Sequence, residues 1–146
     1  MKENIAKYIW DEDKKYAKCE LTVNKKVYIG EAFCDPKDMD MGNEMTGCEI
    51  AFRRAVIAAL VAEREELKIA LAPLKQVYYA MNRSKYFNEK SYENVMLQRQ
   101  TRMIEDDLAT VKEMLAMEKQ GLKELIEKKE EFYQKIRANR NKANTK

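Results

Sequence analysis

The sequence contains no histidine, only four glycines and two prolines, and no apolar run longer than eight residues. Without histidine the chain lacks the commonest general base and a common metal ligand. The longest apolar run, from Ala55 to Ala62, is far shorter than the ~20 residues that span a bilayer. The 28 basic and 25 acidic residues nearly cancel, to a net charge of +3. We therefore expect no membrane partner and no strong general affinity for polyanions.

The three cysteines also exclude some classes of protein. Cys19, Cys34 and Cys48 are odd in number and include no C-x-x-C pair, which argues against a disulfide framework and against a zinc ribbon. Residues 1–4 lack the apolar run of a signal peptide. The sequence therefore predicts reduced thiols, a cytoplasmic protein and no cofactor.

Residues 1–43 are predicted to form a three-stranded antiparallel meander. The stretch 15–23 alternates apolar and polar residues, the stretches 5–10 and 27–33 are rich in β-prone residues, and polar turns separate the three. On the second stretch Cys19, Leu21 and Val23 share one face. We expect the third stretch to return in phase with it, with Val27, Ile29 and Phe33 on that buried face.

Residues 44–83 are predicted to form one long helix that covers the sheet. Thr46 and Glu49 match a capping box, in which each side chain satisfies an amide of the first turn. Apolar residues then recur in helical steps, interrupted once by Arg64, and these are Ile57, Leu60, Leu67, Leu71, Leu74, Tyr78 and Met81. Pro73 predicts either a kink or an end near Ala72 with a restart.

Residues 84–91 read as a connector, 92–140 as a second long helix and 141–146 as a basic disordered tail. Ser91 is the expected N-cap, with Glu93 in the first turn. The core line of this helix is expected to be Leu97, Ile104, Leu108, Val111, Leu115, Leu122, Leu125, Phe132 and Ile136. The two helices should fold back as an antiparallel coiled-coil hairpin.

The second helix has more apolar side chains than a two-helix seam needs. Met103, Met114, Met117, Ile126 and Tyr133 lie beside its core line. This surplus predicts a homodimer or a higher oligomer, while a monomeric hairpin padded by methionine is the alternative. The residues expected at the oligomer interface are Leu108, Val111, Leu115, Leu122, Leu125 and Phe132.

The sequence offers little for catalysis. The segment 35–49 only partly matches a calcium loop, so we expect a solvated acidic loop and no metal. Ser84 and Ser91 are the only serines, and both fall in the connector with no histidine to activate them. We therefore expect a protein that is not an enzyme.

Clusters of basic residues are the stronger signal for binding. The residues expected to contact a partner are Arg53, Arg54, Arg99, Arg102, Lys135, Arg137, Arg140 and Lys142. The stretch from Tyr133 to Lys146 contains no acidic residue, so it suits a phosphate group or an acidic protein surface. A frayed helix end whose cations match the helix dipole is the alternative.

One pattern resembles a known group of proteins. It consists of Gly30-x-Ala32-x-Cys34-x-Pro36-x-Asp38 followed by Gly47-x-x-Ile50-Ala51-x-x-Arg54-Ala55. It looks like a pattern in small uncharacterised proteins of phages, prophages of Gram-positive bacteria and actinobacteria, which are similar to the double-stranded-RNA-binding-domain fold. The resemblance covers about residues 15–62 and implies three strands with a helix across one face. The chain has a loop two residues longer before Gly47 and no lysine pair at the helix start, so the resemblance implies the fold without RNA binding.

Together these features predict an α+β protein: a small antiparallel sheet, a long covering helix and a coiled-coil hairpin. The expected function is that of a non-catalytic phage or prophage accessory protein that binds a host macromolecule, with a host protein as the expected partner, and inhibits a bacterial defence system. One alternative is nucleic-acid binding through the same basic residues with Tyr8 and Trp10. Another is a sponge for a charged nucleotide signal.

Overall fold

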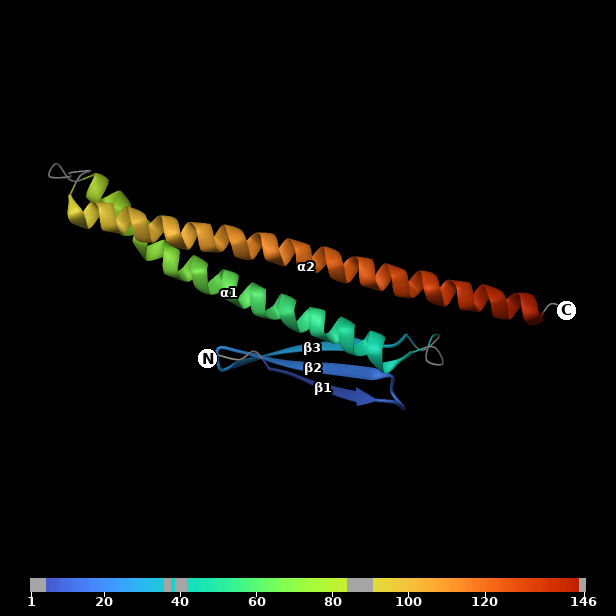
Figure 1. The fold of residues 1–146 in the computed structure, drawn as a ribbon. Helices are drawn as coiled ribbons and strands as arrows, with labels where there is room; N and C mark the ends of the chain where they lie inside the picture. Colours follow the sequence, from blue (N-terminus) through green and yellow to red (C-terminus); the bar gives the residue numbers. More distant parts are fainter. Residues whose placement is uncertain (1–4, 36–37, 39–41, 84–90, 145–146) are drawn as a thin grey trace. The chain divides into compact units, whose positions relative to one another are not determined.

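The structure, a computed structural model, describes residues 5–35, 38, 42–83 and 91–144. Its elements follow in the order β1 (Ile5–Asp11), β2 (Tyr16–Val23), β3 (Lys26–Phe33), α1 (Glu44–Asn82) and α2 (Tyr92–Asn144), as Figure 1 shows. The strands form one antiparallel sheet in the order β1-β2-β3. The predicted α+β class is confirmed.

The chain forms two compact units, to both of which each helix contributes. The first unit consists of Met1–Ala59 and Ala116–Lys146, so it holds the sheet, the start of α1 and the second half of α2. The second unit is Leu60–Leu115. In each unit the segments of α1 and α2 run antiparallel, as predicted: Arg53 contacts Glu118 in the first, and Lys75 faces Glu105 in the second.

A two-residue turn joins β2 to β3 and sets the faces of the sheet. Asn24 and Lys25 both have positive φ, 51° and 67°, as in a type I′ hairpin turn. Val23 therefore pairs with Lys26, and each odd-numbered residue of β2 pairs with an even-numbered residue of β3. The three-residue turn expected from the sequence would have paired odd with odd.

This register corrects the predicted face of β3. Ala17, Cys19 and Leu21 of β2 are buried, as the alternation predicted for this strand, and they pair with Ala32, Gly30 and Tyr28. Val27, Ile29 and Phe33, which were expected inside, are exposed on the other face. The prediction was wrong because a three-residue turn would place the odd-numbered residues of β3 inside, whereas the two-residue turn places the even-numbered ones there.

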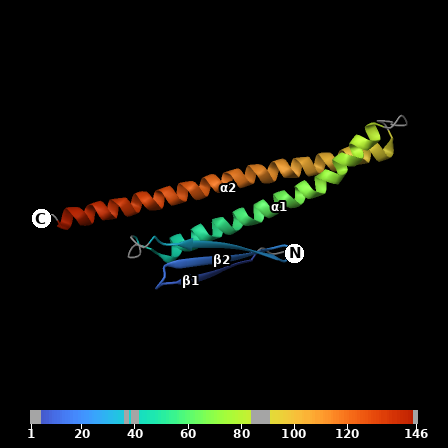
Figure 2. The same cartoon turned by 180° about the vertical axis from the view of Figure 1, so that it is seen from behind.

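The small residues of β3 allow α1 to lie very close to the sheet. A Cβ atom added to Gly30 would lie 1.9 Å from the Ala51 carbonyl oxygen and 2.5 Å from the Ala55 amide nitrogen. In the first unit both views show the start of α1 between the sheet and α2 (Figures 1 and 2). Its core contains Ala17, Cys19, Leu21, Ala32, Ile50, Ala51 and Ala55, with Leu122, Leu125 and Ile126 of α2 packed against it.

The helix α1 begins two residues before the predicted cap. Asn43 is the N-cap, because its Oδ1 accepts a hydrogen bond of 2.8 Å from the Thr46 amide. The capping box of Thr46 and Glu49 was therefore wrong. The heptad series of α1 is confirmed where the helix crosses the second unit, since Leu60 and Leu71 are buried on that line. The helix continues through Pro73 to Asn82 and does not end near Ala72.

The helix α2 starts as predicted and ends later. Ser91 Oγ accepts a 3.2 Å hydrogen bond from the Asn94 amide, which confirms the cap. No glycine or proline follows Gly121, so the helix continues to Asn144; residues 145–146 of the predicted tail lie outside the described residues. Near its end Tyr133 is buried and Phe132 exposed, because a helix of 3.6 residues per turn drifts from a strict heptad.

No helix in the described part of the chain is both long enough and apolar enough to cross a membrane.

Candidate functional site

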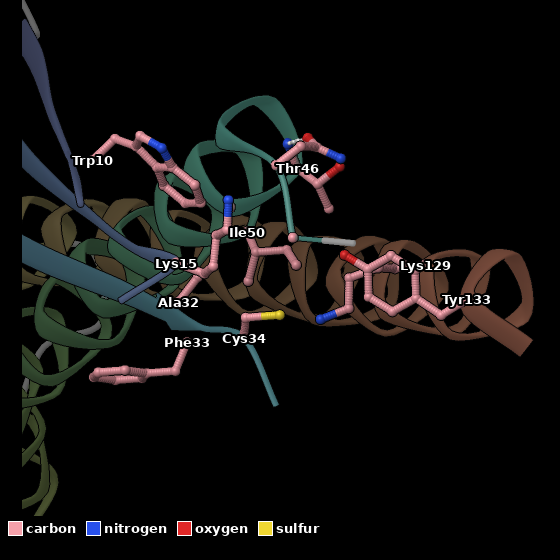
Figure 3. A pocket seen from close by; sticks show the side chains of 12 residues that line it. Trp10, Lys15, Ala32, Phe33, Cys34, Thr46, Ile50, Lys129 and Tyr133 are labelled. Atoms are coloured by element: carbon pink, nitrogen blue, oxygen red, sulfur yellow. Dashed lines mark hydrogen bonds between the residues drawn. The ribbon is translucent and has the colours of Figure 1, made fainter. Parts of the chain in front are cut away.

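A small pocket lies in the first unit, where the end of β3 meets the start of α1 and the second half of α2. Its lining includes Lys15, Cys34, Thr46, Lys129 and Tyr133. In Figure 3 the Cys34 thiol and the Lys129 ammonium group point toward one another. We call it the connection pocket, because the chain passes from the sheet to α1 beside it.

Asp38 holds this connection together. Its side chain is only 3% exposed, and its carboxylate accepts a 2.5 Å hydrogen bond from Arg137 Nη1. Its carbonyl oxygen accepts bonds from the Cys34 thiol at 3.1 Å and from the Gly42 amide at 3.1 Å. The solvated acidic loop expected here is therefore wrong for Asp38, because a cation from α2 compensates its buried charge. Asp40 lies outside the described residues.

The chemistry of the connection pocket is that of a structural contact. Desolvation is the main reason why the pKa of Cys34 lies above its ordinary value, although the charges of Lys129 and Lys15 oppose the rise. A thiol with a raised pKa is mostly protonated at neutral pH and is a weak nucleophile. Burial likewise raises the pKa of Tyr133. Lys15 forms an ion pair with Glu12, whose pKa is lowered by this bond and by the Trp10 indole.

Two of the basic residues predicted to bind a partner form ion pairs with acidic residues of the first unit. Arg137 bonds both Asp38 and Glu130, the latter at 2.9 Å. Arg53 lies 3.5 Å from Glu118. Their role in this structure is to join the start and end of the unit.

The remaining basic residues lie on the surface. Arg54 Nη1 donates to the Glu31 carbonyl oxygen at 2.7 Å, which ties α1 to β3. The other five side chains are exposed along α2, and they are Arg99, Arg102, Lys135, Arg140 and Lys142. They do not form one site, because Arg99 and Arg102 belong to the second unit and the other three to the first.

Much of the predicted oligomer interface is already covered. Leu108, Val111 and Leu115 are each at most 9% exposed within the single chain. Leu122 and Leu125 pack against the core of the first unit. Of the six residues only Phe132 is exposed, so in this conformation the line offers a second copy very little apolar surface. Self-association stays a prediction, and so does the assignment of these six residues to its interface.

The largest feature that sequence reasoning missed is the outer face of the sheet. Five large apolar side chains, each 48% to 67% exposed, share this face, and they are Ile5, Ile9, Val27, Ile29 and Phe33. Phe33 contacts Tyr16 with ring centroids 4.9 Å apart. We call this the outer sheet face. The two-residue turn after Val23 was the signal that could have revealed it.

Neither metal ligands nor known relatives point to another site. Within the described ranges, no three cysteine or acidic side chains come together in a way that could hold a metal ion. Comparison with family models, curated proteins and solved structures gave no match. The surfaces of the chain itself are therefore the basis for inferring its function.

Proposed function

We propose that this chain is a non-catalytic phage or prophage protein that binds a protein of the bacterial host through the outer sheet face and inhibits it. The observation that carries the proposal is the exposure of five large apolar side chains on one face. Large apolar side chains that gather on one exposed face mark interaction sites. The proposed phage or prophage origin is based on the resemblance of the motifs between Gly30 and Ala55 to those of phage and prophage proteins.

The charges on the outer sheet face favour a protein over a nucleic acid or an anionic membrane. The register places two basic residues, Lys7 and Lys18, and three acidic residues, Asp11, Glu20 and Glu31, on this face. Lys18 and Glu20 lie 3.4 Å apart, so their charges partly cancel. A polyanion would be repelled by the excess acid. The apolar side chains lie on β1 and β3, with Lys18 and Glu20 of the central strand between them, and such a mixture of apolar and charged groups suits a protein partner.

The outer sheet face can be used without disturbing the fold. The opposite face of the sheet and the start of α1 form the core of the first unit. Substitutions on the outer face therefore change binding with little effect on stability. This separation makes the proposal testable by single substitutions.

The test compares two exposed isoleucines in the full-length chain. Ile29→Glu changes the outer sheet face, and Ile69→Glu changes an exposed isoleucine of α1 in the second unit. Immobilised wild-type protein captures host proteins, which are identified by mass spectrometry, purified and titrated. We expect Ile29→Glu to weaken the affinity for the captured host protein at least ~30-fold, as for an interface residue worth about 2 kcal/mol. Ile69→Glu should leave this affinity unchanged.

Two results would overturn the proposal. One is a purified host partner that binds Ile29→Glu as tightly as wild type, with circular dichroism showing both variants folded. The other is a wild-type dimer in sedimentation velocity that Ile29→Glu dissociates, since the face would then serve a second copy.

A further inference from the structure

The helical hairpin of the second unit carries an open groove that is separate from the outer sheet face. It is lined by Lys75, Tyr78 and Tyr79 of α1 and by Gln98, Thr101, Arg102 and Glu105 of α2. We call it the hairpin groove. Its lining combines aromatic rings, cations and an amide, which is not the composition of a hydrophobic seam.

The two tyrosines provide a surface for stacking. Their ring centroids are 6.2 Å apart with an interplanar angle of 63°, so the rings present different faces. Tyr79 is 60% exposed. An exposed tyrosine ring stacks readily on a nucleic-acid base, whatever the base, because every base has a π face.

The two cations of the hairpin groove differ in whether an acidic side chain lies near them. Lys75 Nζ lies 4.0 Å from Glu105 Oε1, so its charge is partly compensated. Arg102 has no carboxylate partner within 4.0 Å among the residues that the structure describes. A guanidinium group without an acidic partner is suited to a phosphate, which it can bind through two parallel hydrogen bonds.

The groove lining carries more basic than acidic charge. It contains two basic side chains, Lys75 and Arg102, and one acidic side chain, Glu105, so its net charge is +1. Two tyrosines lie beside these cations. Cations interleaved with aromatic residues are the pattern of proteins that bind single-stranded nucleic acid.

We propose that the hairpin groove binds a nucleotide unit, either free or within a single-stranded nucleic acid. Tyr79 stacks on the base, Gln98 bonds its edge and Arg102 holds the phosphate. An acidic peptide would satisfy the cations and leave the tyrosines without a role, so the nucleotide is the better match. This site is independent of the protein partner proposed for the outer sheet face.

The experiment measures fluorescence anisotropy of a labelled twelve-nucleotide oligouridylate with the full chain at physiological salt, and calorimetry with ATP. We expect Arg102→Gln to weaken binding about 10-fold. The matched control is Arg99→Gln, which removes an exposed arginine of the same helix that does not line the groove, and it should cost less than 2-fold. Tyr79→Ala should weaken binding at least 5-fold, whereas Tyr79→Phe, which keeps the ring, should retain it.

The outcomes separate the sources of the ligand and can refute the site. Binding of ATP with the same pattern of losses identifies a free nucleotide, and binding of the oligonucleotide alone identifies a strand. Equal losses for Arg99→Gln and Arg102→Gln, or equal competition by polyglutamate, would overturn the proposal, as would no binding of either probe at 1 mM. Ile29→Glu should bind the probes like wild type, so failure here is distinguishable from failure of the host-protein proposal.

Discussion

Replacing Gly30 by alanine tests the close contact between the sheet and α1. The added methyl group would lie 1.9 Å from the Ala51 carbonyl oxygen and 2.5 Å from the Ala55 amide nitrogen. Both atoms belong to the backbone of a helix, so no side-chain rotation can relieve the overlap. The sheet and α1 must separate by about 1.5 Å, the difference between 1.9 Å and the 3.4 Å at which ordinary contact begins.

The cost of this separation follows from the packing of the core. A gap of 0.5–1 Å already removes about a quarter to a half of the dispersion energy between facing atoms, and overpacking a core typically costs about 1–3 kcal/mol. Because the gap here is larger and affects the whole interface, we expect Gly30→Ala to lower the free energy of unfolding by about 3 kcal/mol or more. The midpoint of thermal unfolding should then fall by roughly 10 °C.

Two controls isolate the contact from the change of residue type. Gly121→Ala adds the same methyl group, but the nearest atom is Nη1 of Arg53, at 2.7 Å on a flexible side chain. Since alanine also favours a helix over glycine by about 1 kcal/mol, this variant should unfold within about 1 kcal/mol of wild type. Ile29→Ala on the outer face of the same strand should also cost little. Urea unfolding followed by circular dichroism measures all three, and a Gly30→Ala variant as stable as Gly121→Ala would refute the reasoning.

Three further changes test other contacts. Arg137→Ala leaves the carboxylate of Asp38 buried without its cation, so unfolding should become easier by about 3 kcal/mol; the exposed Lys135→Ala is the control, and equal urea midpoints would contradict the ion pair. Lys25→Gly removes a side chain from the left-handed region and should stabilise the fold by about 0.5–1 kcal/mol, so a lower melting temperature would exclude the type I′ turn. Burial raises the pKa of Cys19 above its ordinary 9.0, so the folded state keeps this proton to higher pH than the unfolded state. The free energy of unfolding should therefore fall as pH rises above about 9, and the fall should be smaller in Cys19→Ala. Identical urea midpoints of the wild type at pH 8 and pH 10 would contradict this prediction.

The sequence was sufficient to predict the helices and strands, but not to predict which face of β3 is buried. Runs of β-prone residues, which alternate with polar ones in β2, located all three strands within two residues. The apolar repeat of α1 is buried at Leu60 and Leu71 and half-buried at Leu67, Leu74 and Tyr78. Which face of β3 is buried depends on whether the turn after Val23 has two residues or three. No pattern within residues 27–33 decides it, since both of its faces carry apolar residues.

The candidate sites depended on contacts that join distant parts of the chain. Arg137 was expected on a surface because it lies in a basic stretch, yet it bonds a carboxylate 99 positions away. Asp38 was expected in water because it lies in an acidic loop. Only the tertiary structure brings these two charges together. The sequence already marked Arg102 as a basic residue. That Arg102 lines the hairpin groove and Arg99 does not could be seen only from the positions of both helices.

The contact between Gly30 and α1 has a consequence for how the protein can evolve. Gly30, Ala51 and Ala55 are already among the smallest residues, so nearly every mutation there adds volume and is selected against. The outer sheet face has no such limit, because Ile29 or Phe33 can be exchanged for other side chains without changing the core. A protein built in this way can follow a changing partner with one face of its sheet while selection holds the opposite face constant.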